Sequence, residues 1–225
     1  MGQKVHPKGF RIGVVFGWTS RWFADSKRYK EFLFEDVSLR KYIFSKLKNA
    51  GLEQVDIERS INKMKIIIRV SRPGLVIGRG GSGLEEMKIA VEKFLHKFEA
   101  KRAMVLHKKF SGDTAKSKIE IVVEPVKEPN LSAYLVATTI ADQLARRIPH
   151  KRACNQALER VMGAGAGGVK IALSGRIAGA EIARHEKFGA GTVPLSTIRE
   201  NVDFAAVPSL TKSGYIGVKV WICKK

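Results

Sequence analysis

A glycine-rich turn, placed between two alternating strands and an amphipathic helix, constrains the fold more than any other feature. Residues 78–83 read Gly-Arg-Gly-Gly-Ser-Gly. Before the turn, apolar residues alternate with polar ones through 55–58 and 64–70, which predicts an antiparallel hairpin. After it, apolar residues recur at three- and four-residue spacings over 84–98, which predicts a helix with one buried face. The turn therefore links a small sheet to a helix that covers it.

Three interpretations of this turn are open at the level of sequence. It matches G-x-G-x-x-G, with Glu99 about twenty residues on, as in a dinucleotide site. That site needs a buried strand running straight into the glycines, whereas Arg72 and Pro73 intervene here. The second interpretation is G-x-x-G, formed by Gly78, Arg79, Gly80 and Gly81. Its small residues let a backbone phosphate approach the following helix terminus and Arg79. The third is a purely structural turn that starts the helix.

The remaining pattern predicts an α+β protein of two domains. A helix is expected from near Ser38, and a strand over 119–123 follows the long helix. The Lys-Glu-Pro-Asn stretch at 127–130 is the expected domain boundary. Beyond it we expect two helices that meet at Pro149, and then alternating strands. The predicted division is an extended basic arm over 1–37, a domain over 38–126, and a two-layer α/β domain over 127–225.

The charge of the chain predicts a polyanionic partner. Lys and Arg number 41 against 21 Asp and Glu, for a formal net charge of +20. Nucleic acid or an anionic membrane is the natural counterpart. No apolar stretch approaches the roughly 18 residues of a spanning helix, and the start lacks the apolar core of a signal peptide. We therefore expect a cytoplasmic protein that binds nucleic acid rather than a membrane.

Residues for catalysis or metal binding are not grouped in any familiar pattern. Cys154 and Cys223 have neither disulfide-framework nor zinc-ligand spacing, and the five histidines are scattered. No nucleophile–base arrangement or phosphate-binding loop of a nucleotide hydrolase occurs. We expect no metal, no cofactor, no small-molecule substrate and no enzymatic activity.

Two resemblances make the prediction specific. The order helix, two strands, short helix, G-x-x-G, helix, strand resembles the type II KH domain of bacteria, which implies that the loop clamps about four nucleotides. Residues 2–13 (GQKVHPKGFRIG), 174–184 (SGRIAGAEIAR) and 217–222 (GVKVWI) resemble the opening, signature and ending of the bacterial form of one ribosomal family, the third protein of the small subunit.

The family resemblance implies a structural protein of the small-subunit head. It implies binding to ribosomal RNA, contact with messenger RNA where it enters the ribosome, and neighbours among the tenth, fourteenth and second small-subunit proteins. A KH-type regulator or RNA chaperone acting outside the ribosome is the alternative function.

The resemblance also implies particular contact residues. Messenger RNA would be gripped, and helped to unwind, by Arg146, Arg147, Lys151 and Arg152; a solvated helix face is the alternative for these four. Ribosomal RNA would be contacted by Lys4, His6, Lys8, Arg11, Arg176 and Arg184. Asn155 and Gln156 stand where the family usually carries further basic residues, so the grip is expected to be weaker or shared with Arg160.

Two segments have more than one interpretation. Residues 99–117 exceed what a compact type II KH domain needs, and are predicted to be a basic insertion that touches RNA or a neighbouring protein, or else a free loop. The aromatic residues of the arm must pack against either the rest of the chain or a partner.

Overall fold

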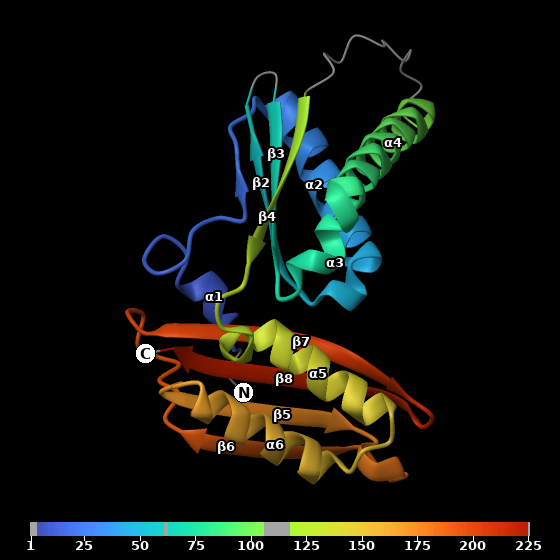
Figure 1. The fold of residues 1–225 in the computed structure, drawn as a ribbon. Helices are drawn as coiled ribbons and strands as arrows, with labels where there is room; N and C mark the ends of the chain where they lie inside the picture. Colours follow the sequence, from blue (N-terminus) through green and yellow to red (C-terminus); the bar gives the residue numbers. More distant parts are fainter. Residues whose placement is uncertain (1–3, 61–62, 106–117, 225) are drawn as a thin grey trace. The chain divides into compact units, whose positions relative to one another are not determined.

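The computed structural model describes residues 4–60, 63–105 and 118–224, and divides the chain into two compact units. We refer to Thr19–Lys127 as the N-terminal unit. The C-terminal unit begins at Glu128 and also includes the described residues up to Trp18. Each unit contains its own sheet and helices (Figure 1), so the predicted α+β class with two domains is confirmed. No helix within the described ranges has both the length and the apolarity to cross a bilayer.

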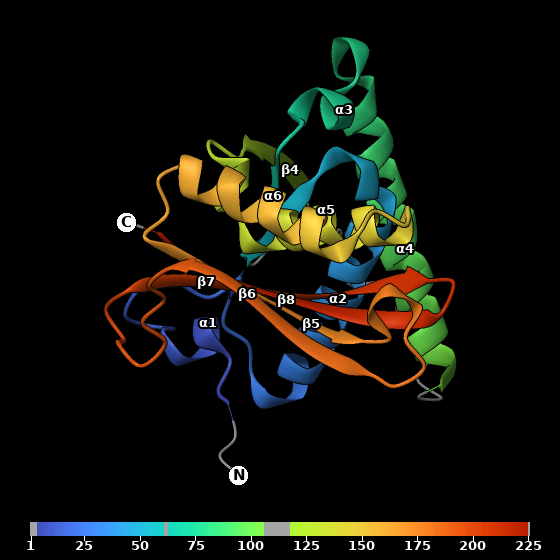
Figure 2. The same cartoon turned by 90° about the horizontal axis from the view of Figure 1, so that it is seen from below.

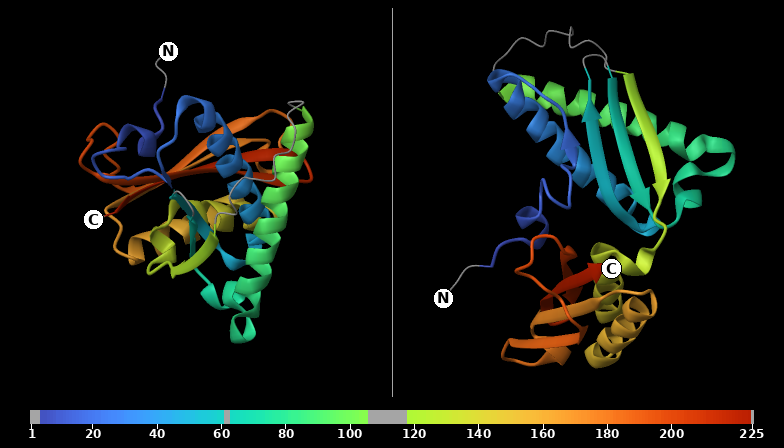
Figure 3. Two further views of the ribbon diagram at one scale, coloured as in Figure 1. Left: turned by 90° about the horizontal axis from the view of Figure 1, so that it is seen from above. Right: turned by 90° about the vertical axis from the view of Figure 1, so that its left-hand side faces the viewer.

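The N-terminal unit is a four-stranded sheet with helices on one face (Figure 3). Its strands lie in the order β1-β2-β3-β4, with β2 and β3 antiparallel and β4 parallel to β3. Its elements are β1 (Ser20–Arg21), α2 (Ser26–Lys46), the 3-10 turn Lys48–Ala50, β2 (Leu52–Arg59), β3 (Lys63–Val70), α3 (Pro73–Ile77), the 3-10 turn Arg79–Gly81, α4 (Ser82–Val105) and β4 (Lys118–Pro125).

The predicted hairpin and its alternation account for the core of this unit. Ile57, Ile66 and Ile68 are fully buried on the sheet face that packs against α2 and α4. Leu39 and Ile43 of α2 are fully buried against them. Residues two apart on a strand share a face, which is why alternation predicted which side chains form the core.

Two boundaries differ from the prediction. Helix α2 begins at Ser26 rather than near Ser38. The hydrophobic pattern did not reveal these first turns, because Leu33 and Phe34 are about half exposed and form no buried stripe. Residues 99–105 of the predicted insertion belong to α4, and 106–117 lie outside the described residues.

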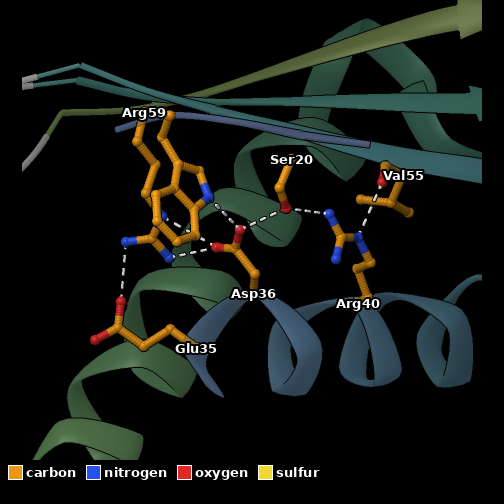
Figure 4. A network of polar contacts seen from close by, with 7 residues as sticks. Ser20, Glu35, Asp36, Arg40, Val55 and Arg59 are labelled. Atoms are coloured by element: carbon orange, nitrogen blue, oxygen red, sulfur yellow. Dashed lines mark hydrogen bonds and ion pairs between the residues drawn. The ribbon is translucent and has the colours of Figure 1, made fainter. Parts of the chain in front are cut away.

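A buried carboxylate holds β1 against α2 and β2. Asp36 is fully buried and accepts hydrogen bonds from Ser20 Oγ at 2.7 Å and from Trp22 Nε1 at 2.8 Å. Arg59 of β2 donates to Asp36 through two nitrogens, at 3.0 and 2.6 Å, and also pairs with Glu35 at 2.9 Å (Figure 4). Removal of one partner from such a pair leaves the other charged, buried and unpaired, which is far more costly than losing an exposed pair.

We expect Asp36→Ala to lower the free energy of unfolding of the N-terminal unit by about 3–5 kcal/mol, since Arg59, Ser20 and Trp22 all lose an acceptor. Urea unfolding measures the loss, and amide hydrogen exchange over 52–59 locates it. Glu124→Gln, which breaks the half-exposed pair with Arg69, is the control and should change stability by less than about 1 kcal/mol. Equal effects of the two substitutions would contradict the role given to Asp36.

The C-terminal unit is a fully antiparallel sheet of order β6-β5-β8-β7, with α5 and α6 on one face (Figure 2). Its core lies between these layers and includes Ile140 of α5, Cys154 of α6 and Ile171 of β5, all fully buried. The elements are α1 (Pro7–Phe10), the 3-10 turn Pro129–Leu131, α5 (Ala133–Ala145), α6 (His150–Gly163), β5 (Gly168–Gly175), the 3-10 turn Ile177–Gly179, β6 (Arg184–Gly191), β7 (Asn201–Thr211) and β8 (Gly214–Lys224).

The start of the predicted arm folds onto this unit. Lys8 pairs with the buried Asp203 of β7 at 2.7 Å, and the His6 ring meets Phe204 edge-on with centroids 5.0 Å apart. Arg11 is fully buried; one of its terminal nitrogens donates to the carbonyls of Pro194, Leu195 and Thr197 at 2.8–3.2 Å, and the other to Pro7 at 3.0 Å. The segment is thus a structural part of the C-terminal unit rather than an extended arm.

Arg11→Lys should lower the free energy of unfolding of the C-terminal unit by about 2–3 kcal/mol. A lysine keeps the charge but cannot donate to carbonyls on both sides of a buried guanidinium. Thermal and urea unfolding of the full chain measure the change, with Lys4→Ala as the control because Lys4 is exposed. An unchanged midpoint for the Arg11 variant would refute this structural role.

Candidate nucleic-acid interface

The glycine loop of the N-terminal unit has a backbone that only glycine adopts without strain. Gly78, Gly80 and Gly81 have φ of 70°, 61° and 86°. A side chain at Gly78 would also place its Cβ only 2.9 Å from the nitrogen of Gly83. Arg79 and Gly80 are exposed at the end of this loop, directly before α4. A narrow exposed backbone with one cation is therefore presented to solvent.

Close packing explains the glycine that completed the dinucleotide pattern. A Cβ on Gly83 would lie 2.6 Å from the carbonyl oxygen of Val76, so this glycine lets α3 lie directly against the start of α4. Strand β3 does not run into the glycines, because α3 stands between them. A dinucleotide fold requires that direct connection, and the geometry therefore disfavours a cofactor site.

The loop has the properties of a phosphate-binding turn. It leads into a helix of 24 residues, whose N-terminal N–H groups and dipole attract anions. The hydroxyl of Ser82 donates to the Arg79 carbonyl at 3.0 Å, which fixes the turn internally. Arg79 is free to extend toward a phosphate, since no ion pair involves it among the described residues.

Sequence reasoning missed two apolar residues beside the loop. Leu75 and Ile77, on α3, are 63% and 36% exposed, whereas Val76 between them is 3% exposed. The short apolar run 75–77 was the available signal, but it did not show which members point outward. The glycine loop therefore has exposed aliphatic side chains beside it.

The four basic residues proposed to grip messenger RNA lie at one turn of the C-terminal unit. Arg146 and Arg147 follow the end of α5, Lys151 and Arg152 lie in the first turn of α6, and all four are exposed. Arg147 has a φ of 64°, a left-handed conformation that costs a non-glycine residue about 1–2 kcal/mol. The first turn of α6 contains no acid, although a helix N-terminus favours negative charge.

Glu186 of β6 reaches the start of α6, where it contacts His150 Nε2 at 3.0 Å, but none of the four cations of the turn forms an ion pair with a described residue. The cations and the helix dipole have the same sign and repel one another, so an anion placed there is attracted by both. Asn155 and Gln156 fall one turn later, and Gln156 accepts a hydrogen bond from Gln143 at 3.3 Å, which ties α6 to α5. Arg160 is exposed on the same helix.

The residues expected to contact ribosomal RNA fall into two groups. Lys4, Arg176 and Arg184 are exposed, although Arg176 also donates to the carbonyl of Ala180 at 2.8 Å and so braces the loop 176–180. Lys8 and His6 are engaged with Asp203 and Phe204.

The expectation that Arg11 contacts RNA is not supported, because its guanidinium is fully buried against backbone carbonyls.

The shifted pKa values of Cys154, Cys223 and His6 indicate structural rather than catalytic roles for these side chains. Burial raises the pKa of the Cys154 thiol to about 12, and burial also raises the pKa of the Cys223 thiol. Burial and the nearby Lys8 lower the pKa of His6, so the neutral ring accepts from the Gly9 N–H through Nδ1. Within the described ranges no three His, Cys, Asp or Glu side chains come together as a metal site would require.

These features define a class: an RNA-binding protein with a type II KH domain and a second α/β domain. Two family models match the chain, "KH domain" over residues 38–131 and "Ribosomal protein S3, C-terminal domain" over residues 140–222.

Curated relatives named "Small ribosomal subunit protein uS3" align over all of this chain. That of Carboxydothermus hydrogenoformans is 45% identical, with 92% of its length covered, and that of Persephonella marina is 45% identical, with 90% covered. That of Caldicellulosiruptor saccharolyticus is 42% identical, with 92% covered.

The chain therefore belongs to the uS3 family of small ribosomal subunit proteins. This is a non-enzymatic family of ribosomal proteins, and the protein is accordingly a ribosome-bound constituent of the cytoplasm rather than an enzyme.

Arg79→Ala should reduce the salt dependence of single-stranded RNA binding by the full-length chain by about one unit of slope, because one phosphate contact is lost. Arg28→Ala, at another exposed arginine of the same unit, is the matched control and should leave the slope unchanged. Filter binding at several salt concentrations measures both. An unchanged slope for the Arg79 variant would rule out a phosphate contact there.

Proposed function

We propose that the protein is a structural constituent of the small-subunit head that binds ribosomal RNA and also grips messenger RNA at its entrance to the ribosome. The glycine loop with Arg79, and the exposed Lys4, Arg176 and Arg184, are the proposed ribosomal RNA contacts. The tenth, fourteenth and second small-subunit proteins are the proposed neighbours.

The observation that carries the messenger RNA assignment is the turn between α5 and α6. Its four cations are exposed, the first turn of α6 lacks an acid, and Arg147 holds a strained backbone conformation. A turn selected only for stability would carry a glycine at the left-handed position and an acid at the helix start. The cost is understandable if the cations bind the phosphates of a single strand, which disfavours its re-pairing without any bond being hydrolysed.

The aromatic residues near the start bear on the alternative, a regulator or chaperone outside the ribosome. The Trp22 ring contacts those of Tyr29 and Phe32, with centroids 5.2 and 5.6 Å apart, so part of this set packs within the chain. Trp18 and Phe23 remain 68% and 93% exposed. These two still favour a large permanent partner, which supports the ribosomal proposal over a free-standing module.

We expect ribosomes carrying Lys151→Ala with Arg152→Ala to translate through a stable messenger RNA hairpin more slowly than parent ribosomes. Translation of an unstructured message, and sedimentation of the assembled small subunit, should be unchanged. The matched control is Lys41→Ala with Lys48→Ala, which removes two exposed lysines from the other unit. The measurement is the rate of hairpin passage relative to the unstructured message.

Arg147→Gly separates binding from folding in the same assay. It should slow hairpin passage while leaving the free energy of unfolding unchanged or higher by up to about 1 kcal/mol, since glycine relieves the left-handed backbone. Equal hairpin passage by parent and by both variants would overturn the proposed grip on messenger RNA.

A further inference from the structure

The face of the C-terminal sheet opposite α5 and α6 carries a positive surface that the proposed function does not use. We call it the open face. Alternation along the strands and the observed register bring Lys170, Lys187 and Lys219 to this face, together with His185, Ser174 and Ala206. No signature in the sequence pointed to it, because its residues come from four strands that only the sheet brings together.

Register places these residues in cross-strand rows. Lys187 of β6, Ala172 of β5, Lys219 of β8 and Ala206 of β7 are successive partners across the sheet. Because neighbouring strands lie about 4.8 Å apart, the two lysines rise from positions about 10 Å apart with a single alanine between them. In the next row His185, Ser174, Gly217 and Pro208 are partners in the same way.

The charges of this face are not balanced. At the strand positions of the open face that the structure describes, no Asp or Glu occurs. Lys187 and Lys219 are exposed, and none of the three lysines forms an ion pair with a described residue. The Lys170 ammonium lies 6.0 Å from the centre of the Trp221 ring. Pairs of opposite charge across strands stabilise a sheet, and the lysines of this face have none, so the imbalance favours an anionic partner.

The shape of the face suits a bulky partner that lies flat on it. Between the lysines the side chains are small, those of Ala172, Ser174, Ala206 and Gly217. Ser174 and Ala206 are exposed and Ala172 is buried, so the surface between the two lysines is low. A surface hollow of about 260 Å³ lies at the β5–β6 side of the face and is lined in part by Lys170, Lys187 and Gly189.

The aromatic side chains decide between a single strand and a helix of RNA. Trp221 is only 8% exposed, because Val193 and Leu195 pack against its cluster. The Phe204 ring is in contact with the His6 ring. The central aromatic residues are therefore unavailable for the base stacking on which single-stranded RNA platforms depend. Tyr215, 69% exposed at the hairpin that joins β7 to β8, lies at the rim. Lysines over a flat surface instead match the regularly spaced phosphates of a helix.

We propose that the open face binds the sugar–phosphate backbone of an RNA helix, as a contact separate from the glycine loop and the α5–α6 turn. The phosphates lie on Lys187 and Lys219, with Lys170 and His185 beside them. The identity of the partner as RNA rests on the proposed function, whereas the surface and the preference for a helix rest on the sheet itself.

The test compares binding of the full-length chain to an RNA duplex and to a single strand of the same length. Lys187→Gln with Lys219→Gln should lower the salt slope for the duplex by about two units and leave the slope for the single strand unchanged. Lys41→Gln with Lys48→Gln is the charge-matched control and should alter neither. Ala206→Glu should weaken duplex binding, while the isosteric Ala206→Gln should not, because only the former adds a negative charge between the phosphates and Lys219.

Each opposite result overturns the proposal. An unchanged duplex slope for the Lys187 and Lys219 variant would do so, as would an equal loss in the Lys41 and Lys48 control. A loss confined to the single strand would reassign the face to unpaired RNA. Failure of the messenger RNA proposal is recognised separately, because it concerns hairpin passage by the Lys151 and Arg152 variant and leaves these duplex slopes unaffected.

Discussion

Three buried aspartates hold this strongly basic chain together at the points where its segments join. Asp36 pairs with Arg59 and accepts hydrogen bonds from Ser20 and Trp22. Asp56 pairs with Arg69 at 3.4 Å and accepts a hydrogen bond from Gln54 at 2.6 Å. Asp203 pairs with Lys8 and accepts a hydrogen bond from the Ala133 N–H. With a formal net charge of +20, the fold must overcome self-repulsion. Acids placed inside, each shared by several donors, fasten the segments near the start and leave the outer surface positive.

The pairing of cations with buried acids determines which cations stay exposed for a partner such as RNA. Cations that serve the fold, such as Arg11 and Arg59, are buried or paired, and those available to a partner, such as Arg79 and Lys151, are exposed without an acid. Each of the two units therefore carries exposed cations of its own. This distribution suits a protein embedded in folded RNA, consistent with membership of a small-subunit ribosomal family.

Sequence patterns succeeded where the structure depends on near neighbours along the chain. Alternation through 64–70 predicted the buried face of β3, and the helical spacing after the glycines predicted α4. Patterns failed where burial is supplied by distant residues. The family resemblance implied that Arg11 contacts RNA. Nothing near Arg11 in the sequence signals its burial, because its partners at 194–197 lie far along the chain. The start of helix α2 was also missed, because its first turns bury few apolar side chains and so give no hydrophobic pattern.

The sequence by itself determined the α+β class, the glycine loop, the family, and the basic turn before α6. These depend on local spacing and on short motifs, which the order of residues contains directly. Only the tertiary structure decided which cations are free. In the folded structure Arg11 is buried and Lys8 pairs with Asp203. The sheet also brings Lys170, Lys187 and Lys219 from three strands onto one face. The physical reason is that register between strands, and the packing of the first residues on the last sheet, are set by contacts between segments distant in sequence. The glycine turn at 78–83 needed both, since the sequence showed its small residues and only the fold showed that Gly83 serves the packing of α3 on α4.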